Sequence, residues 1–311
     1  MKTQISSPGG TPASRFAFGT MQFGDAADEA ASRAMYDACL EAGITHFDTA
    51  NLYTDGAAET FLGRFAAADR DRLVIATKAG YTGGAGRDNI LSQFDTSRQR
   101  LGMDHVDILY LHRFDPETPL AETMETFADL KSRGLIRHVG LSNFAAWQVM
   151  KAAGIAERLD LTISILQPMY SLVKRQAEVE ILPMAAAEGM VVAGYSPLAG
   201  GLLTGKYARG ETGRLTGNER YAIRYGQDWM RDAAVALTEI AEELGTDPAT
   251  LAVAWAARHP AGPVPLISGR SAEQIAPSLA ALEHTMNDAL YARLAALTPA
   301  PPPATDRTEE G

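Results

Sequence analysis

Short apolar, β-rich runs recur along this chain at intervals of roughly thirty residues, the pattern expected of regularly spaced strands. They begin near positions 16, 44, 73, 106, 136, 163 and 191, and an eighth begins near 264 after a longer gap. Most are separated by helical segments rich in Ala, Glu and Leu. The runs are continuous rather than alternating, which is typical of parallel strands covered by helices. Eight strand–helix units predict an α/β fold, a (β/α)8 TIM barrel.

An open, doubly wound sheet is the competing arrangement. It is disfavoured because no Gly-x-Gly-x-x-Gly follows the first apolar run. Four glycines follow helical runs where a left-handed cap residue is expected: Gly43, Gly102, Gly134 and Gly189. Thr118-Pro119 and Asp247-Pro248 each predict a helix N-cap followed by proline at the first helical position.

The pattern predicts one domain, with residues 1–14 as a lead-in and 15–297 as the barrel. Residues 206–228 form a polar stretch with four arginines, Arg209, Arg214, Arg220 and Arg224. We expect a long loop there, either a lid over a bound cofactor or a solvated surface loop. The Pro-rich, charged residues 298–311 predict a disordered tail.

Composition narrows the class of protein. The chain has 311 residues and a net charge of -10, which argues against a nucleic-acid or anionic-membrane partner. Cys39 is the only cysteine and is expected to be an inert, buried thiol, so no intrachain disulfide exists. Residues 1–14 lack the apolar core of a signal peptide, and no run approaches the ~18 apolar residues of a membrane span. We expect a soluble, cytoplasmic protein, and we predict no metal site.

Four residues with ionisable side chains lie at or just past the ends of three successive apolar runs: Asp48, Tyr53, Lys78 and His112. In a barrel the C-terminal ends of the strands share one mouth, so these side chains should converge there. Any one of them has an ordinary reading as a turn former, a surface charge or a core side chain. Their joint placement favours a catalytic site.

The chemistry follows from the pKa of the phenol. A free tyrosine has a pKa near ~10, too high for an efficient acid at neutral pH. We expect the ammonium of Lys78 to lower the pKa of Tyr53, and Asp48 to keep that ammonium charged. His112 can orient a substrate carbonyl or share the proton. Arg113 either borders the substrate site or forms an outward salt bridge.

Ordered motifs along most of the chain resemble those of the aldo-keto reductase superfamily, from about Arg15 to Leu297. The matching segments are Phe18-Gly19-Thr20-Met21, His46-Phe47-Asp48-Thr49-Ala50-Asn51-Leu52-Tyr53, Ala76-Thr77-Lys78, Leu109-Tyr110-Leu111-His112, Gly140-Leu141-Ser142-Asn143-Phe144 and the run from Tyr195 to Tyr207. The resemblance implies a barrel that reduces aldehydes or ketones with NADPH, NADH being possible, through the tetrad Asp48, Tyr53, Lys78 and His112.

The resemblance also implies a set of cofactor contacts. Ser142, Asn143 and Gln167 would bind the nicotinamide carboxamide, and Tyr195 would stack on its ring unless it is a core aromatic. Other residues of matching segments would line the dinucleotide: Thr20, Met21, Ser196, Pro197, Leu198, Gly200, Leu202 and Lys206. Gly200 to Lys206 also satisfies a P-loop pattern, but Tyr207 replaces the magnesium-binding Ser or Thr, so a nucleotide hydrolase is disfavoured.

The adenosine end is less determined. Ser268, Arg270, Gln274 and Ser278 would contact it, and Arg270 could bind a 2′-phosphate, which would favour NADPH. Ser271 and Gln274 equally fit a helix capping box. The family often has asparagine where this chain has Ser278, which follows Pro277, a residue expected to interrupt a helix.

Three functions stay open. The first is an NADPH-dependent carbonyl reductase acting on a small aldehyde, ketone or sugar. The second is an alcohol or sugar dehydrogenase running the same chemistry in reverse. The third is a redox-sensing regulatory subunit with slow turnover, disfavoured because the sequence shows no appended domain or long helical arm. The substrate and the oligomeric state are not indicated.

Overall fold

The computed structural model describes residues 3–207, 210–305, 307 and 309. Within them, parallel strands close into one barrel in chain order, and the last pairs with the first. The strands are β1 (Ala17–Gly19), β2 (His46–Asp48), β3 (Val74–Ala79), β4 (Val106–Leu111), β5 (Ile136–Ser142), β6 (Ile163–Gln167), β7 (Val191–Tyr195) and β8 (Val264–Ile267). The (β/α)8 barrel is confirmed, and each strand begins within two residues of its predicted start.

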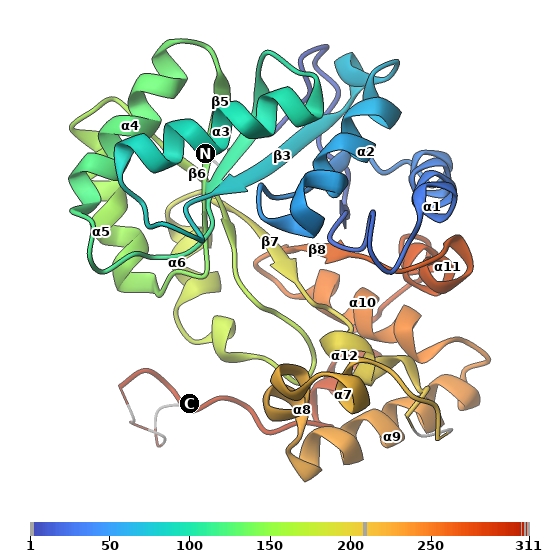
Figure 1. Ribbon diagram of the computed structural model, residues 1–311. Helices are drawn as coiled ribbons and strands as arrows, with labels where there is room; N and C mark the ends of the chain where they lie inside the picture. Colours follow the sequence, from blue (N-terminus) through green and yellow to red (C-terminus); the bar gives the residue numbers. More distant parts are fainter. Residues whose placement is uncertain (1–2, 208–209, 306, 308, 310–311) are drawn as a thin grey trace.

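Helices surround the strands (Figure 1). The α-helices are α1 (Glu29–Glu41), α2 (Ala57–Ala66), α3 (Arg87–Leu101), α4 (Leu120–Ser132), α5 (Ala146–Glu157), α6 (Ile181–Ala187), α7 (Arg214–Gly217), α8 (Glu219–Tyr225), α9 (Asp228–Glu243), α10 (Pro248–Arg258), α11 (Ala272–Ala280) and α12 (Asp288–Ala295). Short 3₁₀ turns are η1 (Tyr53–Gly56), η2 (Arg70–Arg72), η3 (Gln176–Glu178) and η4 (Ala199–Thr204).

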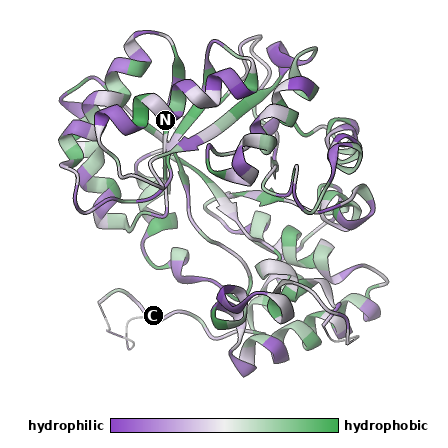
Figure 2. Cartoon of the chain, viewed as in Figure 1, coloured by the Kyte–Doolittle hydropathy of each residue, from purple (hydrophilic) through white to green (hydrophobic). Residues whose placement is uncertain are grey.

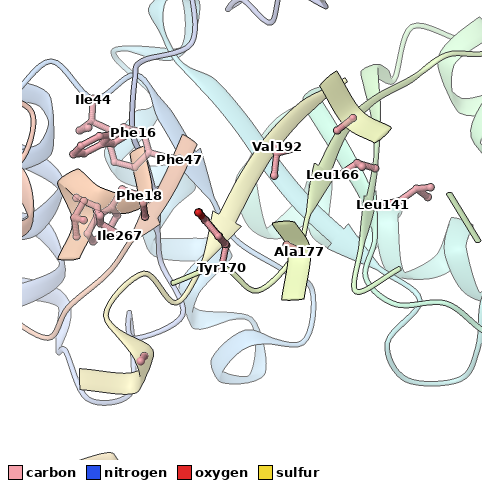
Figure 3. Packing of buried hydrophobic residues seen from close by; sticks show 14 of the residues in the cluster. Phe16, Phe18, Ile44, Phe47, Leu141, Leu166, Tyr170, Ala177, Val192 and Ile267 are labelled. Carbon is pink, nitrogen blue, oxygen red and sulfur yellow. The ribbon is translucent and has the colours of Figure 1, made fainter. Parts of the chain in front are cut away.

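The strands are apolar on both faces because each face meets a different core. Phe18 and Phe47 face the helices and pack edge to face, with ring centroids 6.1 Å apart (Figure 3). Figure 2 shows the resulting distribution, hydrophobic along the strands and hydrophilic on the outer helix surfaces. A second, smaller cluster fills the barrel interior: Ile5, Val74, Ala76, Ile108, Tyr110, Ile165 and Ala193. Side chains alternate along a strand, so Lys78 shares the inward face of Val74 and Ala76.

The lead-in residues plug one end of the barrel. Ser6 and Pro12 pair in an antiparallel bridge, and Ile5 joins the interior cluster. The hydroxyl of Ser7 donates to the carbonyl of Asp71, 2.6 Å away, just before β3 begins. This end therefore lies at the strand starts, and only the opposite end is available as a mouth.

Several local predictions are confirmed. The four capping glycines have positive φ, between 63° and 79°. Asp247 caps α10 by accepting a hydrogen bond from the N–H of Ala249, with Pro248 at the first helical position. Cys39 is fully buried, and burial raises the pKa of its thiol.

Three local predictions are wrong. Helix α4 begins at Leu120 with Pro119 as its cap and no side-chain capping bond, and the hydroxyl of Thr118 donates to Asp115, 2.6 Å away. Residues 206–228 are not one long loop, since they contain α7 and α8. Pro277 does not interrupt α11, which continues to Ala280.

The capping box of α11 is only half formed. Ser271 accepts from the N–H of Gln274, whereas the side chain of Gln274 accepts from the N–H of Arg270.

None of the described helices combines the length and the apolar character needed to cross a bilayer. The disorder predicted for residues 298–311 stays a prediction.

Candidate active site

The four predicted catalytic residues meet at the mouth. Asp48 ends β2, Lys78 is the penultimate residue of β3, and His112 directly follows β4. Tyr53 opens η1 in the loop after β2. Neighbouring strands bring them together because β2, β3 and β4 pair in parallel register.

Lys78 is the centre of this cluster. Its ammonium donates to the carboxylate of Asp48, to the carbonyl of Thr49 at 2.8 Å and to the phenol of Tyr53 at 3.3 Å. Both side chains of the ion pair are buried. The other oxygen of Asp48 accepts from the amide of Gln167, 2.9 Å away. The lysine therefore has its three donors directed at three different groups.

The pKa values of the cluster correct one expectation. Burial is the largest single effect on Lys78 and lowers its pKa, but the charges and hydrogen bonds of Asp48 and Tyr53 together exceed it, so the pKa is raised and the ammonium is held charged. Burial, with a smaller contribution from the charge of Asp48, raises the pKa of Tyr53 by more than Lys78 lowers it. The prediction of a phenol with a lowered pKa is therefore wrong for the protein without substrate. Desolvation outweighs the nearby charge, and Tyr53 keeps its proton.

His112 is a neutral imidazole at the same mouth. Burial, with the charges of Lys78 and Arg113, lowers its pKa to about 3. Its ring lies 6.0 Å from that of Tyr53, centroid to centroid, in an edge-on arrangement. Its Nδ1 is buried and has no hydrogen-bond partner among the described residues. A neutral ring can donate one hydrogen bond to a substrate oxygen and cannot supply a second proton at neutral pH.

A small pocket opens beside Lys78 and His112, and sequence reasoning missed most of its lining. The lining residues are Asn51, Leu52, Lys78, Tyr81, Thr82, Gln93 and His112. Tyr81 packs against His112 with ring centroids 5.0 Å apart, and Arg113 lies over Tyr81 at 4.6 Å from the ring centroid. Arg113 has no ion pair among the described residues, so the structure favours its position beside the pocket over an outward salt bridge. The loop after β3 carries no motif that would have marked it.

Polar residues continue around the mouth to β5, β6 and β7. The hydroxyl of Tyr195 donates to the side-chain carbonyl of Asn143, 2.8 Å away. The amide of Asn143 in turn donates to the carbonyl of His112 and to the hydroxyl of Ser142, at 3.0 and 3.1 Å. The side-chain amide of Gln167 donates a hydrogen bond to Asp48. The structure therefore connects the predicted nicotinamide residues directly to the tetrad.

Backbone strain is concentrated at this mouth. The non-glycine residues with positive φ in the described chain are Thr54, Asp55, Asn143, Asp160, Ser196 and Ala199. All but Asp160 follow the C-terminal ends of strands. Left-handed non-glycine residues persist only where surrounding contacts hold them, and they cluster at functional sites.

The glycine-rich run after β7 forms η4, not the loop and helix of a P-loop. Gly200 and Gly201 have left-handed φ of 67° and 96°. A Cβ on Gly200 would lie 2.7 Å from the ring of Tyr221 in α8, so α8 packs closely over this turn. The ammonium of Lys206 lies near Gly201 and Gly213, in a space that a Cβ on either glycine would fill. This arrangement gives no support to a nucleotide hydrolase.

Comparison with known proteins agrees with this geometry. A model of the aldo/keto reductase family matches residues 15–299. The chain is 32% identical to an uncharacterized oxidoreductase, YrpG, of Bacillus subtilis, over 94% of each chain. It is 33% identical to a probable voltage-gated potassium channel subunit beta of rice, Oryza sativa (88% of this chain, 89% of the relative). It is 34% identical to aflatoxin B1 aldehyde reductase member 2 of the rat (85% and 79%).

The chain belongs to the aldo/keto reductase family. It is an NAD(P)H-dependent oxidoreductase.

The aldo/keto reductase site has polar atoms that fit a nicotinamide dinucleotide. The hydroxyl of Ser268, after β8, is buried without a partner among the described residues. Arg270 next to it is exposed, and Lys206 is half-buried beside the glycine turn. A buried hydroxyl without a described partner, and an ammonium beside a glycine turn, suit phosphate oxygens. No group of three His, Cys, Asp or Glu side chains within the described chain is placed to hold a metal ion.

The other predicted cofactor residues are spread along the same edge. Thr20 follows β1 and donates its hydroxyl to the carbonyl of Asp48, 3.2 Å away. Gln274 is exposed on α11, whereas Ser278, one turn further along that helix, is fully buried. Of the four arginines of residues 206–228, Arg220 is exposed and Arg224 lies over the ring of Tyr221 at 5.7 Å. Arg209 and the side chain of Arg214 lie outside the described residues.

Proposed function

We propose that this protein reduces an aldehyde or ketone to the alcohol with NADPH, Tyr53 acting as the general acid. The observation that carries the proposal is the chain of contacts at the mouth. Asp48 pairs with Lys78, and Lys78 donates to the hydroxyl of Tyr53 at 3.3 Å beside an open pocket.

Each residue has a distinct task in this proposal. A bound nicotinamide would supply hydride to the carbonyl carbon. Tyr53, which burial keeps protonated, donates its proton to the alkoxide oxygen that forms. Lys78 then stabilises the resulting phenolate, since its ammonium already contacts that oxygen. His112 donates a hydrogen bond to the carbonyl oxygen and fixes its position.

The dinucleotide would lie along the mouth from β5 to β8. Ser142, Asn143 and Gln167 bind the carboxamide and Tyr195 stacks on the nicotinamide. The pyrophosphate contacts run from Ser196 through Pro197, Leu198, Gly200 and Leu202 to Lys206, with Thr20 and Met21 on the β1 side. The adenosine end rests on Ser268, Arg270, Gln274 and Ser278. Arg270 favours NADPH over NADH, because its guanidinium is exposed and able to bind a 2′-phosphate.

Replacing the acid tests the proposal. Tyr53→Phe should lower kcat for carbonyl reduction by about 10³-fold, a typical value for a positioned acid. The Kd for NADPH, measured by fluorescence quenching, should change less than about twofold, because the phenol does not bind the cofactor. Tyr36→Phe, which removes a buried hydroxyl in α1, is the control and should keep wild-type kcat. Wild-type turnover in Tyr53→Phe would disprove the role of the acid.

One comparison favours a second function. The similarity to probable potassium channel beta subunits of plants suggests a cofactor-binding regulator with slow turnover. A panel of aldehydes, ketones and sugars assayed with both cofactors, in both directions, separates the possibilities. Tight NADPH binding with negligible turnover on every substrate would favour the regulator, and faster alcohol oxidation would favour a dehydrogenase.

A further inference from the structure

We propose that Glu59 and Arg100 are positioning residues that hold Tyr53 within hydrogen-bonding distance of Lys78. The inference rests on the proposed function, and it concerns two side chains behind the mouth whose described hydrogen bonds go to residues other than the four of the tetrad. Glu59 lies in α2 and Arg100 in α3.

Glu59 is a carboxylate with no exposed surface. One of its oxygens accepts from the hydroxyl of Thr77, 2.7 Å away, and the other accepts from Arg100 at 3.3 Å. A buried charge is costly unless it is paired. Thr77 immediately precedes Lys78 and points out of the barrel, so Glu59 is bonded to the strand at the position next to the catalytic lysine.

Arg100 connects this pair to the loop that carries the acid. The same guanidinium nitrogen donates to the carbonyl of Asn51, 2.8 Å away and two residues before Tyr53. The N–H of Asn51 donates to the carbonyl of Lys78 at 3.1 Å, and its side chain donates to the carbonyl of Gln93 and the hydroxyl of Ser97 in α3. Asn51 is therefore held at its carbonyl, its N–H and its side chain.

The loop after Tyr53 needs such support because its backbone is strained. Thr54 and Asp55 have φ of 47° and 51°, both in the left-handed region, and Gly56 follows at 95°. A Cβ on Gly56 would collide with the guanidinium of Arg100, so glycine is required for the arginine to cross the loop there. Strained residues of this kind persist only when neighbouring contacts determine the conformation.

The tolerance at Tyr53 is small. Its contact with Lys78 is 3.3 Å, and at ~3.6 Å it would no longer be a hydrogen bond. A shift of the loop by a fraction of an ångström would therefore disconnect the acid from its cation. Arg100 contacts both the loop and Glu59, and Glu59 contacts the lysine strand through Thr77. The two residues therefore act together with the backbone bond from Asn51 to Lys78 in setting the separation of the loop from that strand.

Arg100→Lys is the primary test, because lysine keeps the charge but cannot reproduce the planar guanidinium that contacts Asn51 and Glu59 together. We expect kcat for carbonyl reduction to fall about 10- to 100-fold, the size of effect that supporting residues commonly have. The Kd for NADPH should stay within about twofold of wild type, since no cofactor contact changes. Thr77→Val, which removes only the donor to Glu59, should lower kcat by a smaller factor in the same direction.

Arg98→Lys is the matched control. Arg98 lies on the same helix and also pairs with an acid and a carbonyl, those of Asp95 and Asp104, on the outer surface. It should keep wild-type kcat. An equal loss in Arg98→Lys and Arg100→Lys would attribute the effect to α3 in general and overturn the proposal.

A crystal structure of Arg100→Lys gives a reading that does not depend on turnover. The distance from the Tyr53 hydroxyl to the Lys78 ammonium should exceed 3.5 Å in the variant, while Arg98→Lys keeps the wild-type contact. An unchanged distance, or wild-type kcat, would overturn the positioning role. Failure of the wild-type protein to reduce any carbonyl would instead contradict the proposed function, and the measured distance would still decide the role of Arg100.

Discussion

Each end of the barrel buries a carboxylate that is paired with at least one cation, but among the described residues the two cation sets have different further contacts. At the strand starts, Asp107 accepts from Arg70 at 2.8 Å, from Arg137 at 3.0 Å and from the N–H of Ile75 at 2.8 Å. At the mouth, Asp48 pairs with Lys78, which also reaches the hydroxyl of Tyr53.

The two ends differ in the groups that the cations contact besides the carboxylate. The guanidinium groups around Asp107 do not lose their protons, and they lie under the N-terminal plug, where Arg137 also donates to the carbonyl of Ser6. The ammonium of Lys78 lines the pocket and extends to a titratable phenol, that of the half-buried Tyr53. A buried ion pair is therefore weak evidence for catalysis. A third, titratable neighbour beside a pocket is the distinguishing feature.

The largest expected effect is a difference in kcat between variants of Lys78 at the mouth and Arg70 at the strand starts. Lys78→Met should lower kcat by about 10³-fold, because it removes the charge that stabilises the phenolate of Tyr53. Arg70→Met at the other end should leave kcat of the folded protein within about twofold of wild type. Steady-state turnover of both variants, corrected for the folded fraction by circular dichroism, checks this contrast. Comparable losses of kcat would erase the distinction between the ends.

Asp107 should show the reverse behaviour. Asp107→Ala leaves Arg70, Arg137 and the N–H of Ile75 without their acceptor, so the free energy of unfolding should fall by about 3–5 kcal/mol. Urea denaturation measures this loss, and kcat of the folded protein should not change. The exposed pair of Arg33 and Asp37 provides the control, since Asp37→Ala should cost less than about 1 kcal/mol. A stable Asp107→Ala protein would mean that the strand starts do not depend on this cluster.

Buried histidines should make stability depend on pH. Burial lowers the pKa of His46, inside the barrel, to about 4. Between pH ~6.5 and 4 the unfolded chain binds a proton at His46 that the folded protein does not bind. The free energy of unfolding is therefore undiminished by His46 above pH ~6.5 and decreases as the pH falls below that value. At pH 5 the loss from His46 should be about 2 kcal/mol. Urea denaturation at pH 7.5 and 5.0 should show it, and His46→Gln should reduce the difference between the two values.

The smallest expected effect concerns the substrate. Arg113 lies over Tyr81 beside the pocket and has no described ion pair, so it should favour substrates with a carboxylate or phosphate group. Arg113→Ala should raise KM about tenfold for an aldehyde carrying a carboxylate, and leave KM for a neutral aldehyde of similar size unchanged. Arg87→Ala, which removes an arginine paired with Asp129 on the outer helices, is the control. Equal changes in KM for both aldehydes would indicate that Arg113 does not distinguish charged from neutral substrates.

Much of the architecture was predictable because it depends on local spacing. The strand starts, the capping glycines and the placement of Asp48, Lys78 and His112 at strand ends all follow from apolar periodicity. Helices α7 and α8 were missed because their residues are polar and glycine-rich, and such short helices owe their stability to tertiary packing. The pocket residues Tyr81 and Gln93 were missed because loop side chains carry no periodic signal.

The sequence by itself determined the barrel and the identity of the four side chains at its mouth, because a repeated strand–helix unit places every strand end on one rim. Only the tertiary structure decided the protonation of Tyr53, whose pKa depends on burial against one cation. Only the tertiary structure revealed how Glu59 and Arg100, 41 residues apart, join the loop of the acid to the strand of the lysine. Charge and burial act through space, over separations that a linear pattern does not record.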